Sequence, residues 1–279
     1  MRHIHRYVQG LWARQSLALC HCEAQTLAPG LWAKSTLLVL ALLIPLLSGC
    51  GTRPQLQDGP EVLTASDGTT LAAHRYVPLA GSPPGLVLVH RAGGERSVWE
   101  AFAVRAQQSG YLVISLDLRG HGESRNGAAG RKLDYRDFND EDWQAVSLDI
   151  DVALRRLLAL GANPDDLFLV GEGFGANLAL QYTVEHRDVQ GVVLLSAGTS
   201  YHGIKAVPLM EQMSTRPSLL LWGERDDYAA SCGAALQRRA PGHVEVRIYP
   251  GTAHGADIFS SSPESMGQIL VWLDQMGTK

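Results

Sequence analysis

Short apolar runs alternate with longer amphipathic stretches from residue 61 onward. The sequence predicts a hairpin around Asp67-Gly68 in EVLTASDGTTLAAHRYVP, followed by buried strands at GLVLVH, YLVISLD, LFLVGE, GVVLLSA, SLLLWGE and VEVRIYP. Helices are expected between these runs, over about residues 97–109, 141–160, 174–185, 228–239 and 263–276, with a short segment at 204–213. Strands that are apolar throughout and separated by helices form parallel sheets covered on both faces. The pattern therefore predicts an α/β fold with a mixed, mostly parallel sheet of about eight strands.

The N-terminal part of the chain follows a different pattern. An unbroken apolar run, LLVLALLIPLL at residues 37–47, follows Lys34 and precedes Ser48-Gly49-Cys50. This run is shorter than the roughly 20 residues that a membrane-spanning helix needs. A positive flank, a short apolar core and small residues are the layout of a secretory signal.

Leu47-Ser48-Gly49-Cys50 resembles a bacterial lipobox, and the resemblance implies cleavage before Cys50 and a diacylglycerol on its thiol. We expect residues 1–49 to be a leader, residues 50–60 a polar tether rich in Gly and Pro, and residues 61–279 the folded domain. The expected location is the cell envelope, with the lipid in a membrane, at the outer membrane or on the periplasmic face. A plain signal peptide with a chance cysteine is the alternative.

The charge and cysteine content of the chain argue against a nucleic-acid partner and against an internal disulfide. The chain has 24 basic and 28 acidic residues and a net charge of −4. The leader holds four of the basic and one of the acidic residues, which leaves 20 and 27 and a net charge of −7 for the remainder. Such a domain has no basic surface for nucleic acid. Cys232 is the only cysteine after Cys50, so no internal disulfide is available.

Four segments directly after predicted strands carry motifs: VHRAGGERSVW (89–99), DLRGHGES (117–124), GERDD (223–227) and GTAHG (251–255). With these motifs, residues 61–276 resemble the α/β-hydrolase superfamily, in a compact form similar to dienelactone-hydrolase-like and serine-hydrolase-like members. The resemblance implies an eight-stranded α/β-hydrolase fold with helices on both faces and a minimal cap. It also implies the chain order of elbow, acid and histidine that this superfamily uses.

The segment LFLVGEGFGANLAL (167–180) matches the nucleophile elbow of that superfamily in all but one residue. In the G-x-nucleophile-x-G motif the third residue stands on a strained strand-to-helix turn. The family's Ser, Cys or Asp would be at position 173, and this chain has Gly173. Glycine adopts such a turn with little strain but offers no reacting atom.

The resemblance assigns the remaining parts of an active site. Asp226 is the expected acid, with Asp227 as the alternative, and His254 is the expected histidine. The backbone amides of Ala92 and Phe174 are the expected donors of an oxyanion hole. These groups would orient a base and stabilise an oxyanion even without a nucleophile.

Other candidate residues are expected to have structural roles rather than to take part in proton transfer. His90, His121 and Arg119 resemble family positions that hold loops by hydrogen bonds, and four aromatic residues are expected in the core or lining a pocket: Trp99, Trp143, Trp222 and Phe259. A nucleophile elsewhere is not expected: Glu172 adjoins position 173, but its side chain should point away from the apex of the turn. Ser196, Ser200 and Cys232 lie in other segments.

Three functions remain open from the sequence. The first is an impaired or non-catalytic, lipid-anchored protein that binds an ester-like small molecule in the old pocket. The second is a hydrolase of esters or lactones in which His254 activates water, with the residual acceleration of roughly 10³ to 10⁴ that a site without its triad retains. The third is an ordinary serine hydrolase whose serine codon was altered recently or misread. No cofactor is expected, because no metal cluster or phosphate-binding loop is visible and no acidic residue ends the strand after GEGFG.

Overall fold

The computed structural model describes residues 57–79 and 81–277. Cys50 and the tether up to residue 56 lie outside the described residues, so the expected lipid anchor stays a prediction. Within the described ranges, no helix has the length and apolar character needed to cross a membrane.

One eight-stranded sheet forms the centre of the domain, in the order β1-β2-β4-β3-β5-β6-β9-β10. Its strands are β1 (Gly59–Thr64), β2 (Thr70–Tyr76), β3 (Pro84–Val89), β4 (Leu112–Leu116), β5 (Asn163–Glu172), β6 (Val189–Leu195), β9 (Ser218–Gly223) and β10 (Val244–Tyr249). The β1–β2 and β2–β4 pairs are antiparallel and the other pairs are parallel. This is the mixed sheet that the apolar pattern predicts, and the α/β-hydrolase fold class is confirmed.

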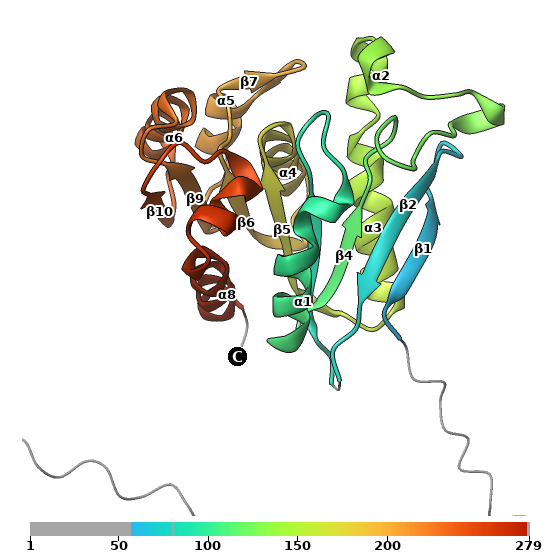
Figure 1. Ribbon diagram of the computed structural model, residues 1–279, viewed down its shortest axis with the longest axis horizontal. Helices are drawn as coiled ribbons and strands as arrows, with labels where there is room; N and C mark the ends of the chain where they lie inside the picture. Colours follow the sequence, from blue (N-terminus) through green and yellow to red (C-terminus); the bar gives the residue numbers. More distant parts are fainter. Residues whose placement is uncertain (1–56, 80, 278–279) are drawn as a thin grey trace, which may run out of the picture. The chain divides into compact units, whose positions relative to one another are not determined.

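Helices cover both faces of the sheet (Figure 1). They are α1 (Glu100–Gln108), α2 (Asp140–Gln144), α3 (Ser147–Ala159), α4 (Phe174–Glu185), α5 (Ala206–Glu211), α6 (Asp227–Arg239), α7 (Ile258–Ser261) and α8 (Glu264–Met276). Side chains of α1, α7 and α8 pack in one hydrophobic cluster, and those of α3, α4, α5 and α6 pack in the other. The sheet is thus the middle of three layers.

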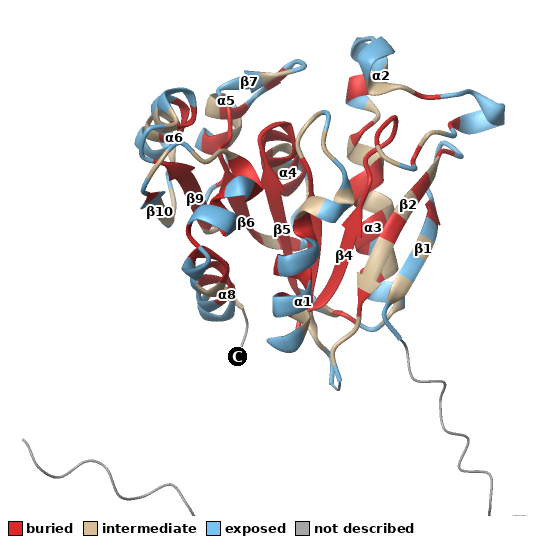
Figure 2. Cartoon of the chain, in the orientation of Figure 1, coloured by how far each residue is buried: buried red, intermediate tan, exposed pale blue. Residues whose placement is uncertain are grey.

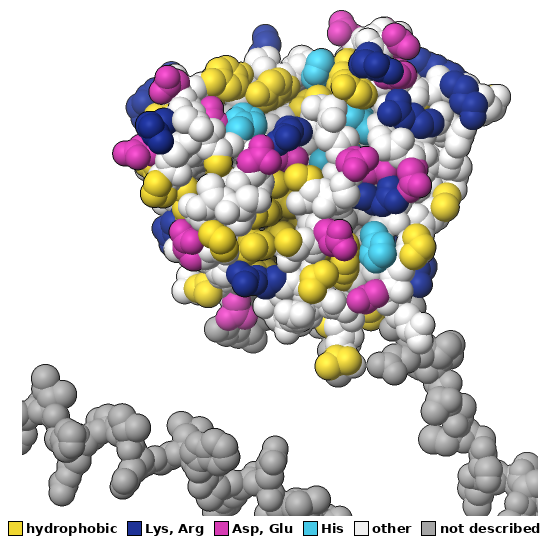
Figure 3. Space-filling view, in the orientation of Figure 1, with side chains coloured by type: hydrophobic (Ala, Val, Ile, Leu, Met, Phe, Trp, Pro, Cys, Tyr) yellow, Lys and Arg dark blue, Asp and Glu magenta, His cyan; other side chains and the backbone are white. Residues whose placement is uncertain are grey.

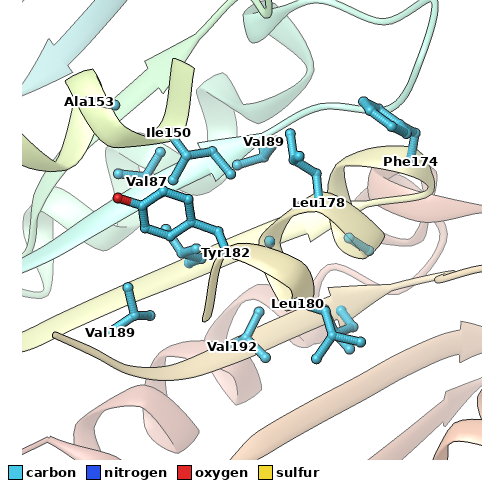
Figure 4. Packing of buried hydrophobic residues seen from close by; sticks show 14 of the residues in the cluster. Val87, Val89, Ile150, Ala153, Phe174, Leu178, Leu180, Tyr182, Val189 and Val192 are labelled. Atoms are coloured by element: carbon cyan, nitrogen blue, oxygen red, sulfur yellow. The ribbon is translucent and has the colours of Figure 1, made fainter. Parts of the chain in front are cut away.

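Alternating residues of the central strands supply the two hydrophobic clusters. In β3, Val87 and Val89 face one cluster while Leu86 and Leu88 face the other, and all four side chains are fully buried. Figure 2 shows the same burial along β4 and β5, with the more exposed β1 at the edge. Figure 4 shows Leu178 on the side of α4 that faces Val89. Two buried faces explain why these strands are apolar at nearly every position.

Three local details differ from the sequence-based expectation. The strand β1 begins at Gly59, so the last two residues of the expected tether belong to the folded domain. The expected helix over 141–160 is divided into α2 and α3. A small hairpin, β7 (Ser200–Tyr201) and β8 (Ile204–Lys205), precedes α5 where only a short segment at 204–213 was expected.

The turn of this hairpin explains why it was missed. His202 and Gly203 both have positive φ angles, 44° and 83°, as a two-residue type I′ turn requires. Asn or Asp commonly precedes the glycine in such turns, and histidine is a weaker signal. The His202 ring stacks on Trp143, with centroids 3.6 Å apart, which helps to hold the turn.

Candidate active site

The turn between β5 and α4 has the geometry of a nucleophile elbow. Gly173 connects the strand to the helix with φ 53° and ψ −119°, a backbone conformation that residues other than glycine adopt only with strain. A β-carbon on Gly171 would lie 2.3 Å from the carbonyl oxygen of Gly175. A β-carbon on Gly175 would lie 2.4 Å from the carbonyl oxygen of His90. The two flanking glycines therefore let strand and helix approach as closely as the motif predicts.

Asp226 and His254 meet at the carboxyl end of the sheet. Asp226 follows β9 and His254 follows β10, and His254 Nδ1 lies 2.6 Å from Asp226 Oδ2. Asp227 is exposed at the start of α6, so the structure pairs the first of the two candidate acids with the histidine. With Nδ1 donating to the carboxylate, Nε2 is left as a proton acceptor. Among the described residues, Nε2 has no hydrogen-bond partner.

Position 173 lies directly against this histidine. An ideal β-carbon on Gly173 would stand 3.8 Å from His254 Nε2, which leaves hydrogen-bond reach for a hydroxyl on that carbon. The same β-carbon would lie 3.1 Å from Arg91 Cβ, closer than side chains normally pack. The elbow therefore faces His254. Arg91 limits the space for the β-carbon of any side chain at position 173.

Arg91 belongs to a network that the sequence did not reveal. Its guanidinium lies 3.3 Å from the fully buried carboxylate of Glu172 and 3.5 Å from Asp257. Glu172 also accepts a hydrogen bond of 2.8 Å from the backbone N–H of Ala256. Because Ala256 and Asp257 closely follow His254, the network fastens the histidine loop to the loop after β3. Glu172 thus has a positioning contact and no hydrogen bond to His254 within the described chain.

His90 fixes the loop that carries Ala92. Its Nε2 accepts a hydrogen bond of 2.9 Å from the backbone N–H of Leu118, and its Nδ1 lies 2.7 Å from the carbonyl oxygen of Arg91. Complete burial lowers the pKa of His90 to about 3, so the ring is neutral and donates from Nδ1. His90 is therefore a structural residue, as the sequence predicts.

The two expected oxyanion donors are free in the described part of the chain. The backbone N–H groups of Ala92 and Phe174 donate to no protein acceptor there. Phe174 is the first residue of α4, where the helix dipole favours negative charge. The close contact between Gly175 and the His90 carbonyl brings the start of α4 against the loop that carries Ala92.

None of the alternative nucleophiles reaches the histidine. Ser196 is buried, and its Oγ accepts a hydrogen bond of 2.9 Å from the backbone N–H of Gly255. Cys232 is buried in α6, and Ser200 is exposed at the start of β7. No hydrogen bond joins any of them to His254 within the described residues.

Two pockets adjoin the aromatic residues next to the elbow. One has a volume of about 620 Å³ and is bounded by α2, α4, α5 and the β7–β8 hairpin, and the second, of about 350 Å³, lies beside it. Trp143 and His202 line both, and the ring of Phe174 packs edge-on against these two rings. Neither pocket is lined by Gly173, Asp226 or His254.

The surface near the carboxyl ends of the strands carries both charged and hydrophobic side chains. Figure 3 shows basic, acidic and histidine side chains gathered over the upper part of this face, the end at which Figure 1 places α2 and β7. Within residues 57–79 and 81–277, no group of three or more His, Cys, Asp or Glu side chains is placed to hold a metal ion.

The serine aminopeptidase S33 family matches residues 84–216 of this chain. The matched region runs from β3 to the residue before Pro217, so it includes Arg91 and the elbow but ends before Asp226 and His254. The matched region therefore contains Gly173 and Arg91, the two residues whose contact limits the space at the turn.

Solved structures share the fold at low sequence identity. An α/β hydrolase from Penicillium sp. is 15% identical, with a TM-score of 0.67, and the match covers 80% of this chain and 99% of the other. An esterase from Pyrococcus furiosus is 17% identical over 79% of this chain and 91% of its own, with a TM-score of 0.59. A dienelactone hydrolase from Anabaena variabilis is 18% identical over 79% and 97%, with a TM-score of 0.58. At these identities the likeness concerns the fold.

Proposed function

Given that this chain has the α/β-hydrolase fold, we propose that it is a lipid-anchored member of the superfamily with impaired catalysis, which binds an ester-like small molecule at the Gly173 site. One observation carries this proposal. The elbow points at His254, since a β-carbon on Gly173 would stand 3.8 Å from Nε2, yet glycine supplies no nucleophile. In this proposal Asp226 orients His254, and the amides of Ala92 and Phe174 bind the ligand's carbonyl oxygen.

The position of Arg91 weighs against a recently altered or misread serine codon. A serine at 173 would put its β-carbon 3.1 Å from Arg91 Cβ, and Arg91 is itself held by Glu172 and Asp257. A chain that lost its serine recently should still have room for it. In this structure a serine would require Arg91 to shift by a few tenths of an ångström.

The full chain is expected to resist labelling by a fluorophosphonate probe and to hydrolyse aryl esters slowly. Without a nucleophile, the orienting and oxyanion groups retain an acceleration of roughly 10³ to 10⁴ over water, several orders below a complete triad. Gel-based labelling and release of nitrophenol measure the two outcomes. Stoichiometric labelling of the unmodified protein would overturn the proposal, because it requires a serine nucleophile elsewhere.

A second candidate function is ester or lactone hydrolysis by a water that His254 activates. The free Nε2 of His254, oriented by Asp226, is the observation that favours it. The variant His254→Ala separates the two candidates, because a general base contributes roughly 10² to 10⁴-fold. A comparable fall in the slow hydrolysis rate supports activated water, and an unchanged rate supports binding alone.

We also propose that Cys50 carries the lipid. Metabolic labelling with a radioactive fatty acid should mark the full chain and place it in the membrane fraction. The variant Cys50→Ser should lose both properties, whereas Cys232→Ser, which changes a buried thiol in α6, should keep them. Equal labelling of both variants would exclude a lipid on Cys50.

A further inference from the structure

The position that a β-carbon would occupy at Gly173 adjoins an apolar atom, Arg91 Cβ, and a polar atom, His254 Nε2. Apart from the glycine and its chain neighbours, only Arg91 Cβ, at 3.1 Å, and His254 Nε2, at 3.8 Å, lie within 4 Å of it among the described residues. A carbon that carries a hydroxyl suits both neighbours, because the carbon contacts Arg91 and the hydroxyl contacts His254.

The tight contact with Arg91 favours a separate molecule over a side chain. A β-carbon bonded to residue 173 is fixed at 3.1 Å from Arg91 Cβ, so one of the two residues has to shift. A free molecule can move by the few tenths of an ångström that relieve this contact while its hydroxyl stays within reach of Nε2.

The groups around this place are those that an acyl transfer needs. His254 Nε2 is a free acceptor held in place by the 2.6 Å contact with Asp226. The amides of Ala92 and Phe174 are free donors on the two loops that meet at the start of α4. When these amides bind the carbonyl oxygen of an ester, the carbonyl carbon is expected to lie next to the alcohol hydroxyl that is hydrogen-bonded to His254 Nε2.

Resting on the function proposed above, we propose that this site transfers an acyl group from an ester to a primary alcohol, whose hydroxyl takes the place beside Gly173. The alcohol thus supplies the oxygen that glycine lacks. The protein then has little activity toward an ester in water, and gains activity when a suitable alcohol is present.

The transfer balances without a further reagent. His254 Nε2 accepts the hydroxyl proton as the alcohol oxygen bonds to the carbonyl carbon, and the carbonyl electron pair moves to the oxygen held by Ala92 and Phe174. The tetrahedral intermediate then re-forms its carbonyl and breaks the bond to the original leaving oxygen. That oxygen takes the proton from His254. The products are the new ester and the released alcohol or phenol.

The test uses the full chain, para-nitrophenyl acetate and methanol. We expect nitrophenol release to rise with methanol to a plateau, and methyl acetate, measured by gas chromatography, to exceed acetate. Ethanol should act similarly, whereas tert-butanol should not, because its bulk meets Arg91. The variant His254→Ala should lose roughly 10² to 10⁴-fold of the methanol-dependent rate.

A carbon at position 173 provides a second test. The variant Gly173→Ala places a methyl group where the alcohol carbon would stand, so methanol should no longer raise the rate, and thermal unfolding checks that the variant is folded. If this variant does not fold, the comparison of methanol, ethanol and tert-butanol in the unmodified protein still tests the proposed acyl transfer. A methanol effect that persists in His254→Ala, or no methyl acetate from the unmodified protein, would overturn acyl transfer while leaving the impaired hydrolase intact. Fast acetate release without alcohol would instead overturn the impaired hydrolase.

Discussion

A serine at position 173 is expected to restore esterase activity only when Arg91 is replaced by glycine at the same time. In Gly173→Ser alone, the new β-carbon lies 3.1 Å from Arg91 Cβ, so the serine or the loop after β3 is displaced. In the double variant Gly173→Ser/Arg91→Gly that contact is absent, and the hydroxyl reaches His254 Nε2. Removing the serine of a triad costs about 10⁶-fold in kcat in subtilisin, so a gain of roughly 10³-fold or more is expected even with imperfect geometry.

The measurements are aryl ester hydrolysis and fluorophosphonate labelling of the single and double variants. Gly173→Ala/Arg91→Gly is the matched control, because it adds the same carbon without the oxygen. Arg91→Gly alone shows how much stability the loss of the guanidinium beside the buried Glu172 costs, which thermal unfolding reports. Full activity in Gly173→Ser alone would show that Arg91 does not restrict the site.

Replacing Gly175 by alanine is expected to destabilise the domain severely. The added β-carbon would lie 2.4 Å from the carbonyl oxygens of both Val89 and His90, which are backbone atoms at the end of β3. Backbone cannot rotate away as a side chain can, so α4 has to move from the sheet. We expect a loss of more than about 4 kcal/mol in the free energy of unfolding, in the range reserved for severe overpacking.

Chemical denaturation of the Gly175→Ala and Gly267→Ala variants measures this effect against a control. Gly267 lies inside α8 and, apart from its chain neighbours and the backbone of its own helix, no described atom lies within 4 Å of its β-carbon position. Alanine there should stabilise the helix by about 0.5 to 1 kcal/mol, because glycine is a poor helix former. Equal stabilities for the two variants would mean that the elbow is looser than the structure indicates.

The sequence predicts the fold well because the core strands are unambiguous. Residues such as Val87 and Leu88 are apolar on both sides of the strand, which is typical of a strand covered on two faces. The β7–β8 hairpin is not predicted because its turn uses His202, which has a positive φ and stacks on Trp143, a residue far away in the sequence. A contact of that kind leaves no local pattern.

The sequence predicts the site residues that belong to recognisable motifs. It does not predict contacts between loops that are far apart in the sequence. Asp226 and His254 each follow a strand in a recognisable motif, and the structure joins them by a 2.6 Å contact. The contact of Arg91 with position 173 is not predictable, because Arg91 lies 82 positions before Gly173 in the sequence and only the packing of two loops brings its Cβ to that turn.

The relaxed backbone at Gly173 limits how this chain can evolve. Any residue with a β-carbon at φ 53° and ψ −119° stores strain of about 1 to 3 kcal/mol, and glycine avoids most of it. A lineage that returns to serine would first lose that stability, and would gain catalysis only after a second substitution at position 91. In a protein of ordinary, marginal stability, a loss of about 1 to 3 kcal/mol is about a tenth to a half of the free energy of unfolding. A serine at position 173 would therefore have to bring enough benefit to offset the conformational strain that glycine avoids.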